Sequence, residues 1–566
     1  MTRRRTVISL VLLFVFLIPS AQFAWRNRDM PEFGYLHDDG VLFVSAKSLA
    51  DGNGFRISNL PENPSQTKFP PLYPLFLSVI WKLDPNFPGN LQLAAFFGWI
   101  LTALGLVLAW KLYQADGASE KRVWLLIGLL SVSPYWTLFG SMMFAEMLFT
   151  CFVLASIILA RKSEDTRALV GAGLLAACAY LTRTAGVALI LSVPVLFLWK
   201  KKWKAAAIFT APPVIAAAVW GVWQMGHLPQ SGDLTLLYYT DYMGFRKPNF
   251  GLDNMTVVLW KNLDQILYSI GALVLPKIVD LLPVKILTQV VGVAMIAGVV
   301  RMARRRISLD YALFSLVSVG ILLIWHYPAN ERLVLPMFPL LLAGLVTEME
   351  HFFGMLKGVL RPAANEPNTH SNEHASGKAP RKANRRQNGA GNRVVGAIFG
   401  GGVAALLVIA VGLQIFMSFS FLHASTAQQR GRLRERMVAY QWMRANLPAE
   451  AAVMSYDDPL VYLYSGHRGN YMPLLPRWWY AEDHKSMRDA YRNVAAYCRS
   501  RRLSYVYFTS EDLSREVGEE DRESIAKSIA ANPELESLFT AGTGTVYRVR
   551  PEGSPSAQNR TDLTIP

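Results

Sequence analysis

Charged residues are scarce in this chain of 566 residues, and so are cysteines. Only 17% of the residues are charged, 52% are hydrophobic, and the mean hydropathy is +0.23. A water-soluble enzyme of this length needs more charge on its surface, so that class of protein is excluded. Apolar runs long enough to cross roughly 30 Å of hydrocarbon recur along most of the chain. The sequence therefore predicts a polytopic α-helical membrane protein.

The three cysteines are Cys151, Cys178 and Cys498, and their spacing matches neither a disulfide framework nor a metal motif. Two of them lie in apolar runs and the third lies in the C-terminal part of the chain. Each is expected to act as a small buried hydrophobe, so no cysteine chemistry is predicted.

The net charge of +16 does not indicate a nucleic-acid-binding protein. The basic residues form short clusters between apolar runs, and no soluble module interleaves them with aromatic residues. Such clusters follow the positive-inside rule, by which short loops rich in Lys and Arg stay in the cytoplasm. The charge therefore reports on membrane topology.

About eleven transmembrane helices are expected. They lie near residues 7–24, 91–113, 122–140, 143–160, 168–182, 185–199, 205–224, 287–302, 311–325, 333–346 and 394–419. Alternating the sides of the membrane puts every basic cluster in the cytoplasm, namely residues 121–122, 161–162, 200–204, 301–306 and 357–393. This agreement is stronger evidence for the topology than hydropathy alone. The first run also resembles a cleaved signal peptide, and either interpretation sends the next loop outward.

The rest of the chain divides around these helices. Residues 1–350 form a transmembrane module whose first outer loop covers residues 26–90. Two apolar segments, residues 69–83 and 266–284, are short or broken by proline, so we expect them to lie at the outer interface. Residues 351–393 are rich in Asn, Pro, Gly, Lys and Arg, which predicts a disordered cytoplasmic linker. The last transmembrane helix occupies residues 394–421.

Residues 422–566 have the pattern of a small soluble α/β domain on the outer side of the membrane. Helices are expected at residues 432–446 and 486–502, and strands at residues 452–456 and 504–509. Residues 539–549 have the pattern of a hairpin.

Charged and polar residues gather in the outer loops of the predicted transmembrane module. A charged group at membrane depth costs several kcal/mol unless it faces protein or water, so each one is a functional candidate. A carboxylate can act as a base on a hydroxyl, while Arg and Lys can hold a departing phosphate. The candidates are His37, Asp38, Asp39, Lys68, Glu146, Arg183, His326, Tyr327, Glu331 and Arg332.

Structural roles compete with the functional ones. Asp39 has the right position to cap a helix that starts at Val41. Arg183 has the character of a lipid-headgroup anchor, and Glu331 has Arg332 as a neighbouring ion-pair partner. A lone histidine at a helix end, as His326 is, is commonly a satisfied polar residue. The pair Asp457-Asp458 follows a predicted strand and precedes a proline, which favours a turn or a helix cap over catalysis.

Several segments resemble the GT-C superfamily of membrane glycosyltransferases, which use polyprenyl-phosphate-linked sugars and include aminoarabinose transferases and protein O-mannosyltransferases. The main segments are His37-Asp38-Asp39 up to Gly54, followed by Lys68-Phe69-Pro70-Pro71-Leu72-Tyr73-Pro74. Further similar features are Glu146 after Ser133-Pro134-Tyr135, the turn at residues 181–183, and the Arg-x-x-x-Pro segment from Arg332 to Pro336. The resemblance covers roughly residues 1–350. One departure is Phe69, which separates Lys68 from the double proline.

The resemblance implies a function and a set of roles. Asp38 is the expected base, with Asp39 and Glu146 as the other catalytic carboxylates. Lys68, Arg183 and Arg332 are expected to bind the donor phosphate. His37, His326 and Tyr327 are expected to give polar support.

The predicted function is transfer of a sugar from a polyprenyl-phosphate donor to an acceptor hydroxyl at the outer face of the cytoplasmic membrane. The acceptor is a lipid, a glycan or a protein. The cofactor is not identified by the sequence, and if a divalent metal takes part, Asp38 and Glu146 are its expected ligands. The alternative function is a polytopic transporter or flippase of cell-envelope glycolipids. The odd number of predicted helices and the lack of internal repeats argue against a transporter.

The topology is testable with reporter fusions. Fusions at Ser163 and Lys201 are expected to report a cytoplasmic location, because both loops carry basic clusters. Fusions after Asp233 and after Ser510 are expected to report an external location. A cytoplasmic signal at Ser510 would overturn the alternation of sides on which the candidate site depends.

Overall fold

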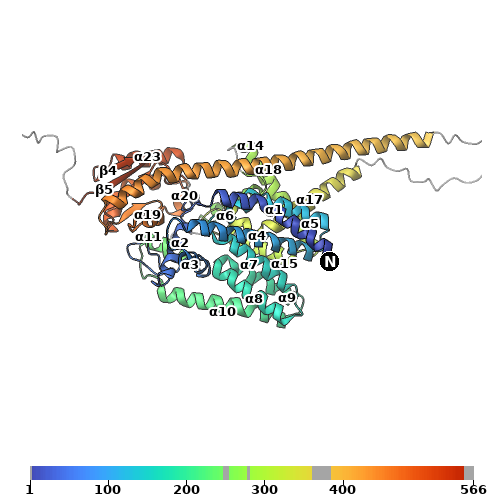
Figure 1. Cartoon of the computed structure of the whole chain (residues 1–566), viewed down its shortest axis with the longest axis horizontal. Helices are drawn as coiled ribbons and strands as arrows, with labels where there is room; N and C mark the ends of the chain where they lie inside the picture. Colours follow the sequence, from blue (N-terminus) through green and yellow to red (C-terminus); the bar gives the residue numbers. More distant parts are fainter. Residues whose placement is uncertain (1–2, 247–253, 277–280, 360–383, 515, 553–566) are drawn as a thin grey trace, which may run out of the picture.

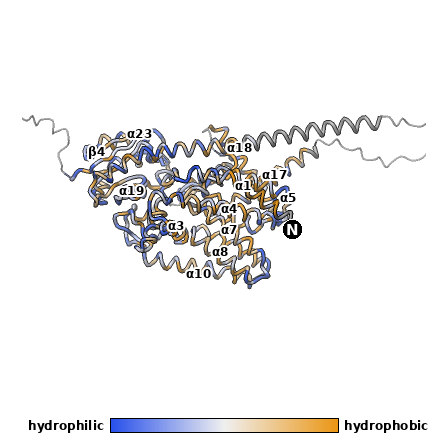
Figure 2. Tube along the Cα trace, viewed as in Figure 1, coloured by the Kyte–Doolittle hydropathy of each residue, from blue (hydrophilic) through white to orange (hydrophobic). Residues whose placement is uncertain are grey.

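The computed structural model describes residues 3–246, 254–276, 281–359, 384–514 and 516–552. A bundle of helices occupies most of the molecule, and a smaller α/β domain lies at one end of it (Figure 1). The long helix α18 runs along one side of the bundle and leads into that domain. Hydrophobic residues dominate the bundle helices, whereas the α/β domain and the neighbouring loops are more hydrophilic (Figure 2).

The helices up to residue 359 make up the bundle and its loops. They are α1 (Arg3–Arg26), α2 (Asp38–Ala50), α3 (Leu72–Leu83), α4 (Leu91–Ala115), α5 (Glu120–Ser131), α6 (Pro134–Ser141), α7 (Ala145–Ala160), α8 (Thr166–Thr182), α9 (Val187–Trp199), α10 (Trp203–His227), α11 (Leu234–Thr240), α12 (Tyr242–Arg246), α13 (Met255–Ala272), α14 (Leu282–Arg304), α15 (Leu309–Leu323), α16 (Glu331–Val334) and α17 (Phe338–Val359).

Five helices of the described residues are long and apolar enough to cross a membrane, and a sixth results if α5 and α6 count as one bent span. They are Val7–Arg26, Leu91–Ala115, Trp203–His227, Leu282–Arg304 and Glu331–Leu356. Shorter apolar helices cover α3, α7, α8, α9 and α15. The predicted class, a multi-pass helical membrane protein, is therefore confirmed. The count of eleven and the side that each loop faces stay predictions.

The predicted span at residues 122–140 is not one straight helix. It divides into α5 and α6, which meet at an angle of 56°. Pro134 opens α6, where its missing N–H leaves no helical bond unmade, and the Ser133 hydroxyl accepts a hydrogen bond from Trp136 N. Proline and a capping serine therefore end one helix and begin the next, a signal that hydropathy alone does not register.

Glycines let the backbones of α14 and α17 approach closely. A Cβ atom added to Gly298 would lie 1.9 Å from the carbonyl oxygen of Gly344, so no side chain fits there. Such small-residue contacts are typical of helix packing in membranes. There the hydrophobic effect does not drive helices together, because the lipid tails are as apolar as the side chains, and close packing takes its place. This packing holds α17 and, through it, the preceding turn that carries Arg332.

The C-terminal domain contains a mixed five-stranded sheet with strand order β2-β1-β3-β5-β4. Its strands are β1 (Val453–Ser455), β2 (Gly469–Asn470), β3 (Tyr505–Thr509), β4 (Leu535–Ala541) and β5 (Gly544–Val549). The strand β1 pairs in parallel with β2 and β3, whereas β5 pairs antiparallel with β3 and β4. Its short helices are α19 (Asp458–Ser465), α20 (Pro476–Tyr480), α21 (His484–Arg492), α22 (Val494–Ser500) and α23 (Glu519–Ala530). The predicted α/β character and the hairpin are confirmed.

The last predicted membrane span and the first predicted helix of the domain are one element. The helix α18 runs without a break from Asn384 to Asn446 over 63 residues. Residues 360–383, most of the predicted cytoplasmic linker, lie outside the described residues.

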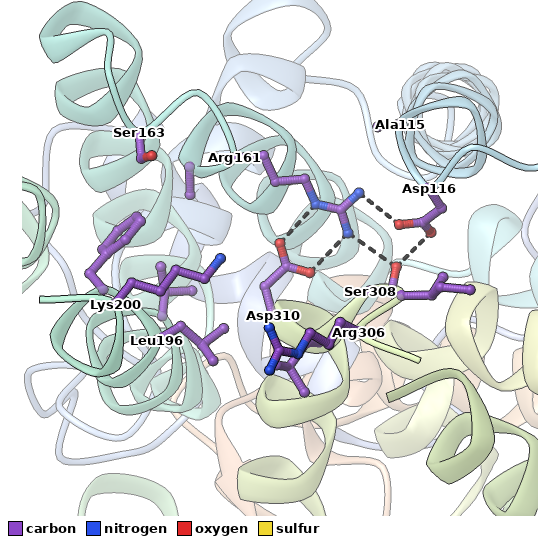
Figure 3. Close-up of a pocket in the computed structure, with 14 residues that line it drawn as sticks. Ala115, Asp116, Arg161, Ser163, Leu196, Lys200, Arg306, Ser308 and Asp310 are labelled. Carbon is purple, nitrogen blue, oxygen red and sulfur yellow. Dashed lines mark hydrogen bonds and ion pairs between the residues drawn. The ribbon is translucent and has the colours of Figure 1, made fainter. Parts of the chain in front are cut away.

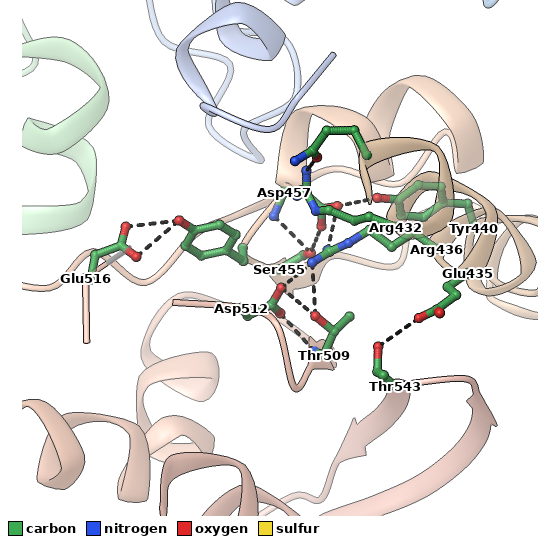
Figure 4. Close-up of polar contacts among 12 residues, drawn as sticks. Arg432, Glu435, Arg436, Tyr440, Ser455, Asp457, Thr509, Asp512, Glu516 and Thr543 are labelled. Atoms are coloured by element: carbon green, nitrogen blue, oxygen red, sulfur yellow. Dashed lines mark hydrogen bonds and ion pairs between the residues drawn. The ribbon is translucent and has the colours of Figure 1, made fainter. Parts of the chain in front are cut away.

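A buried arginine joins α18 to the sheet of the C-terminal domain. Arg436 Nη1 lies 2.7 Å from Asp457 Oδ2, and its Nη2 lies 2.6 Å from Asp512 Oδ1. Tyr440 also donates to Asp457, and Thr509 Oγ1 accepts from Arg436 Nη2 at 3.0 Å (Figure 4). Because every charge in this cluster has a partner, the cluster fixes α18 against the carboxyl ends of β1 and β3.

Removal of this cation is expected to destabilise the domain. Arg436→Met leaves two buried carboxylates without a counter-ion, so the free energy of unfolding should fall by about 3–5 kcal/mol. Pulse proteolysis across a urea series measures the change. The control is Glu435→Gln, which removes a neighbouring exposed charge whose contact is Thr543. Equal stability of the Arg436 and Glu435 variants would contradict the assignment.

Candidate active site

Arg332 lies at the centre of a cluster of charged side chains from three separate parts of the chain. Its Nη2 atom lies 2.9 Å from Asp38 Oδ2, at the start of α2. Its Nε atom lies 2.7 Å from Glu146 Oε1, in the first turn of α7. The guanidinium also lies over the ring of Phe144, 4.6 Å from its centroid. One cation thus joins two of the predicted catalytic carboxylates.

Arg183 reaches the same carboxylate from the end of α8. Its backbone is extended, which ends the helix, and its guanidinium forms an ion pair with Glu146. Glu146 is 1% exposed, and its Oε2 atom has no hydrogen-bond partner among the described residues. The position of Glu146 near the amino end of α7 also favours a negative charge. Glu146 therefore holds two guanidiniums in fixed positions.

Asp38 is the more accessible of the two carboxylates that contact Arg332. Its side chain is 24% exposed, so an acceptor can reach it. Burial acts to raise the pKa of Asp38, but the Arg332 and Lys68 cations outweigh this effect and hold the pKa below its ordinary value. Asp38 is therefore ionised at neutral pH, as a base must be.

Asp39 has a different environment from that of Asp38. It is fully buried, and it accepts hydrogen bonds from Gly34 N at 2.8 Å and from Gly40 N at 3.0 Å. Burial raises the pKa of Asp39 to about 6. The helix begins at Asp38 and not at Val41, so the predicted helix start was wrong. The contacts of Asp39 fix the fold of the first loop.

Lys68 is a buried cation surrounded by aromatic rings. It is 7% exposed, and its Nζ atom lies 5.1, 4.4 and 4.9 Å from the ring centroids of Phe69, Tyr238 and Tyr242. It forms no ion pair with a carboxylate of the described residues. Burial lowers the pKa of Lys68, and the nearby Asp38 charge opposes that shift only in part. A buried ammonium group without an ion-pair partner favours the binding of an anion.

His326 and Tyr327 lie beside Lys68 and its aromatic rings. The His326 ring centroid is 5.9 Å from that of Tyr242 and 4.7 Å from that of Tyr327. Burial, together with the charges of Lys68 and Arg246, lowers the pKa of His326 to about 3, so the ring is neutral. Its Nδ1 atom has no hydrogen-bond partner among the described residues. Both side chains therefore lie near the predicted phosphate-binding residue Lys68, and their role of polar support stays a prediction.

His37 connects the first loop to the C-terminal domain. Its Nε2 atom lies 2.8 Å from Asp458 Oδ1, across 421 positions of sequence. Tyr239 donates to the same oxygen at 2.8 Å, and Asn59 donates to the other oxygen of Asp458. The backbone of His37 has φ +64°, a strained value for a residue with a side chain. The contact from Asp458 therefore holds the residue that directly precedes Asp38.

Asp458, from the acidic pair Asp457-Asp458, and the tyrosines around Lys68 contact predicted site residues, which the sequence alone does not reveal. The acidic pair has the pattern of a turn or cap, but α19 has no side-chain cap, and both carboxylates make long-range contacts. The available signal was the cluster of tyrosines at positions 238, 239 and 242, between two long apolar segments.

The two predicted metal ligands do not converge on an open site. Arg332 lies between Asp38 and Glu146. In the part of the chain that the structure describes, no group of three or more His, Cys, Asp or Glu side chains is arranged to hold a metal ion. The arrangement fits a guanidinium between the carboxylates and does not fit a metal that bridges them.

Comparison with family models and with curated proteins finds no match for the sequence. Among solved structures, the chain is similar to ArnT from Cupriavidus metallidurans bound to undecaprenyl phosphate, with a TM-score of 0.52 at 14% identity over 97% of this chain and 98% of that chain. ArnT in the apo state gives a TM-score of 0.46 at 14% identity over 90% and 93% of the two chains. The apo oligosaccharyltransferase of Archaeoglobus fulgidus gives 0.49 at 11% identity over 96% and 75%.

The first of these likenesses exceeds a TM-score of 0.5, and at this identity it establishes the fold alone. ArnT is an aminoarabinose transferase with the GT-C fold. The chain therefore has the fold of the GT-C glycosyltransferases, and the resemblance predicted from the sequence is confirmed at that level.

The contact of His37 with Asp458 makes stability depend on pH. Burial alone would lower the pKa of His37, but the Asp458 carboxylate outweighs burial and raises it. The stabilising effect is therefore full below the ordinary histidine pKa of about 6.5 and is lost as the pH rises through the raised value. The thermal midpoint of the wild type should exceed that of His37→Gln by more at pH 6 than at pH 9.

The control for this prediction is His227→Gln, since His227 is exposed and its ring contacts Trp223 of its own helix. Its effect on the thermal midpoint should not change with pH. If the thermal midpoint of the wild type exceeded that of His37→Gln by the same amount at pH 6 and at pH 9, an ion pair between His37 and Asp458 would be contradicted.

Proposed function

We propose that the protein is a membrane glycosyltransferase that moves a sugar from a polyprenyl-phosphate donor to an acceptor hydroxyl at the outer face of the cytoplasmic membrane. The observation that supports this most directly is the convergence of Asp38, Lys68, Glu146, Arg183 and Arg332 at one place in the GT-C fold. A base and a group of phosphate-binding cations are what this transfer requires. The acceptor is a lipid, a glycan or a protein.

The donor phosphate binds to the cations of the cluster. Lys68 has three aromatic neighbours and forms no ion pair with a carboxylate of the described residues, so a phosphate supplies a negative charge beside it. Arg183 and Arg332 are held by Glu146 with donor groups left over for phosphate oxygens. Phosphate competes with Asp38 for Arg332, since both are anions that bind the same guanidinium.

Binding of the donor then prepares the base. When the phosphate binds Arg332 in place of Asp38, the Asp38 carboxylate is released and faces the acceptor. Asp38 removes the hydroxyl proton while the acceptor oxygen attacks the anomeric carbon, and the bond from that carbon to the phosphate oxygen breaks. Polyprenyl phosphate leaves with the electron pair, and the configuration is inverted. The cations stabilise the charge that develops on the leaving phosphate.

A lipid flippase or transporter would use the same charges to line a pathway. The interlocked pairs of Asp38, Glu146 and Arg332 favour a fixed site over a pathway. The two functions differ in whether polyprenyl phosphate is released. Incubation of the purified protein with a short-chain polyprenyl-phosphate sugar and acceptor releases polyprenyl phosphate if the protein is a transferase. A flippase leaves the donor intact.

Replacement of the base is expected to abolish most turnover. Asp38→Asn keeps the size of the side chain but cannot accept the proton, so donor turnover should fall by roughly 10²- to 10⁴-fold. The rate of polyprenyl phosphate release measures the effect. The matched control is Asp51→Asn, in the same loop, whose partner is Lys47. Turnover of Asp38→Asn near that of the wild type would shift the base to Glu146.

Lysine is expected to replace Arg183 and Arg332 only in part. Arg183→Ala and Arg332→Ala should slow donor turnover more than Arg183→Lys and Arg332→Lys do, because lysine keeps the charge but loses the two-pronged geometry. Turnover and donor affinity are both measured. If Arg332→Ala inserts normally and turns over the donor like the wild type, Arg332 is not a phosphate ligand.

A further inference from the structure

A cavity of about 360 Å³ opens at the far end of the bundle from the Arg332 cluster. The helix α7 connects the two places, since Glu146 lies in its first turn and Arg161 directly follows its last residue. The 16 residues of α7, at 1.5 Å per residue, separate them by about 24 Å. The cavity is therefore distinct from the candidate active site.

The polar side of this cavity is a closed network around Arg161. Arg161 Nη1 lies 2.8 Å from Asp116 Oδ1, and its Nε and Nη2 atoms each lie 2.8 Å from an oxygen of Asp310. Ser308 donates to Asp116 Oδ2 at 2.6 Å (Figure 3). Both carboxylates are therefore already bound to other groups of the cavity wall.

Two further cations line the cavity without such partners. Lys200 reaches in from the end of α9 toward Asp310, and Arg306 comes from the loop between α14 and α15 (Figure 3). Neither forms an ion pair with an acidic residue in the described part of the chain. Since Arg161 occupies both carboxylates, the cavity carries an uncompensated positive charge that an anion would neutralise.

Apart from Ser163, whose hydroxyl accepts a hydrogen bond from Lys202, the remainder of the cavity wall is apolar. Its residues are Ala115, Ala160, Val193, Leu196, Phe197, Ile307 and Leu309. The adjacent Trp199 and Trp203 are 70% and 66% exposed, and exposed tryptophans of this kind mark the membrane–water interface. A cationic rim above an apolar wall at that depth matches a ligand with an anionic head and an apolar tail.

The backbone at the rim is strained. Three residues with side chains have positive φ angles there: Lys201 at 57°, Arg306 at 60° and Ser308 at 48°. Such conformations persist where the surrounding structure enforces them, and they gather at ligand sites. The surrounding structure therefore fixes the conformation of the two loops that carry Lys200 and Arg306.

We propose that this cavity binds the phosphate group of an anionic phospholipid, in the leaflet opposite to the candidate active site. Lys200 and Arg306 bind the phosphate oxygens, and the apolar wall contacts the first part of an acyl chain. The loops that carry these cations belong to the basic clusters that the positive-inside rule assigns to the cytoplasm, where anionic lipids are abundant. The site is independent of the proposed transfer reaction.

The test measures lipid binding to the purified full-length protein in neutral detergent by native mass spectrometry. The probes are dioctanoyl phosphatidylglycerol, dioctanoyl phosphatidylcholine and inorganic phosphate. Phosphatidylglycerol should bind saturably and more tightly than the other two. The double variant Lys200→Gln/Arg306→Gln should lose at least about tenfold in affinity for it, as expected when two charged contacts to one phosphate are removed.

The matched control is Lys204→Gln/Arg305→Gln, which removes the same charge from the same two clusters outside the cavity. It should bind phosphatidylglycerol like the wild type. An equal loss in both double variants would show diffuse attraction to a basic surface and would overturn the proposal. Equal binding of phosphatidylcholine, or of inorganic phosphate, would overturn the assignment to an anionic lipid.

Discussion

The guanidinium of Arg332 connects the parts of the chain that form the candidate active site. It contacts Asp38 at the start of α2 and Glu146 at the start of α7, and Glu146 in turn contacts Arg183 at the end of α8. Two carboxylates this close would repel each other without a cation between them. Arg332 therefore lets the protein hold a fixed carboxylate and an accessible one in the same buried place.

The C-terminal domain takes part in this arrangement from the other side. Asp458 binds His37, which directly precedes Asp38 and has a strained backbone. The adjacent residue, Asp457, binds Arg436 of α18. Two neighbouring carboxylates thus connect the loop before α2 to the helix that leads into the domain. The domain is accordingly part of the structure that positions Asp38, and not only an appendage.

Much of this could be predicted from the sequence, because the membrane imposes simple rules. Hydropathy and the basic clusters identified the apolar helices, and the rule that charges at membrane depth face protein identified Asp38, Glu146, Arg183 and Arg332 as candidates. Those four side chains prove to be in contact. The bend between α5 and α6 was predictable from Ser133 and Pro134, but the apolar residues continue through it, so hydropathy alone indicated a single helix.

The rest could not be predicted, because it depends on contacts between distant parts of the chain. The pair of His37 with Asp458 joins residues 421 positions apart, and a turn was the simpler interpretation of Asp457-Asp458. The aromatic surroundings of Lys68 come partly from Tyr238 and Tyr242, in the short helices α11 and α12, which are far from it in sequence. The cavity near Arg161 likewise forms where four helix ends meet. Packing of this kind leaves no periodic pattern in a single sequence.

In the proposed reaction, Asp38 and the donor phosphate compete for Arg332. The most direct test is the affinity of the purified protein for a short-chain polyprenyl phosphate, measured for the wild type and for Asp38→Asn. Removal of the competing charge leaves Arg332 free for the phosphate, so the variant should bind polyprenyl phosphate more tightly even though it turns over the donor far more slowly. Affinity that is unchanged or weaker in Asp38→Asn, in a variant that folds normally, would contradict the claim.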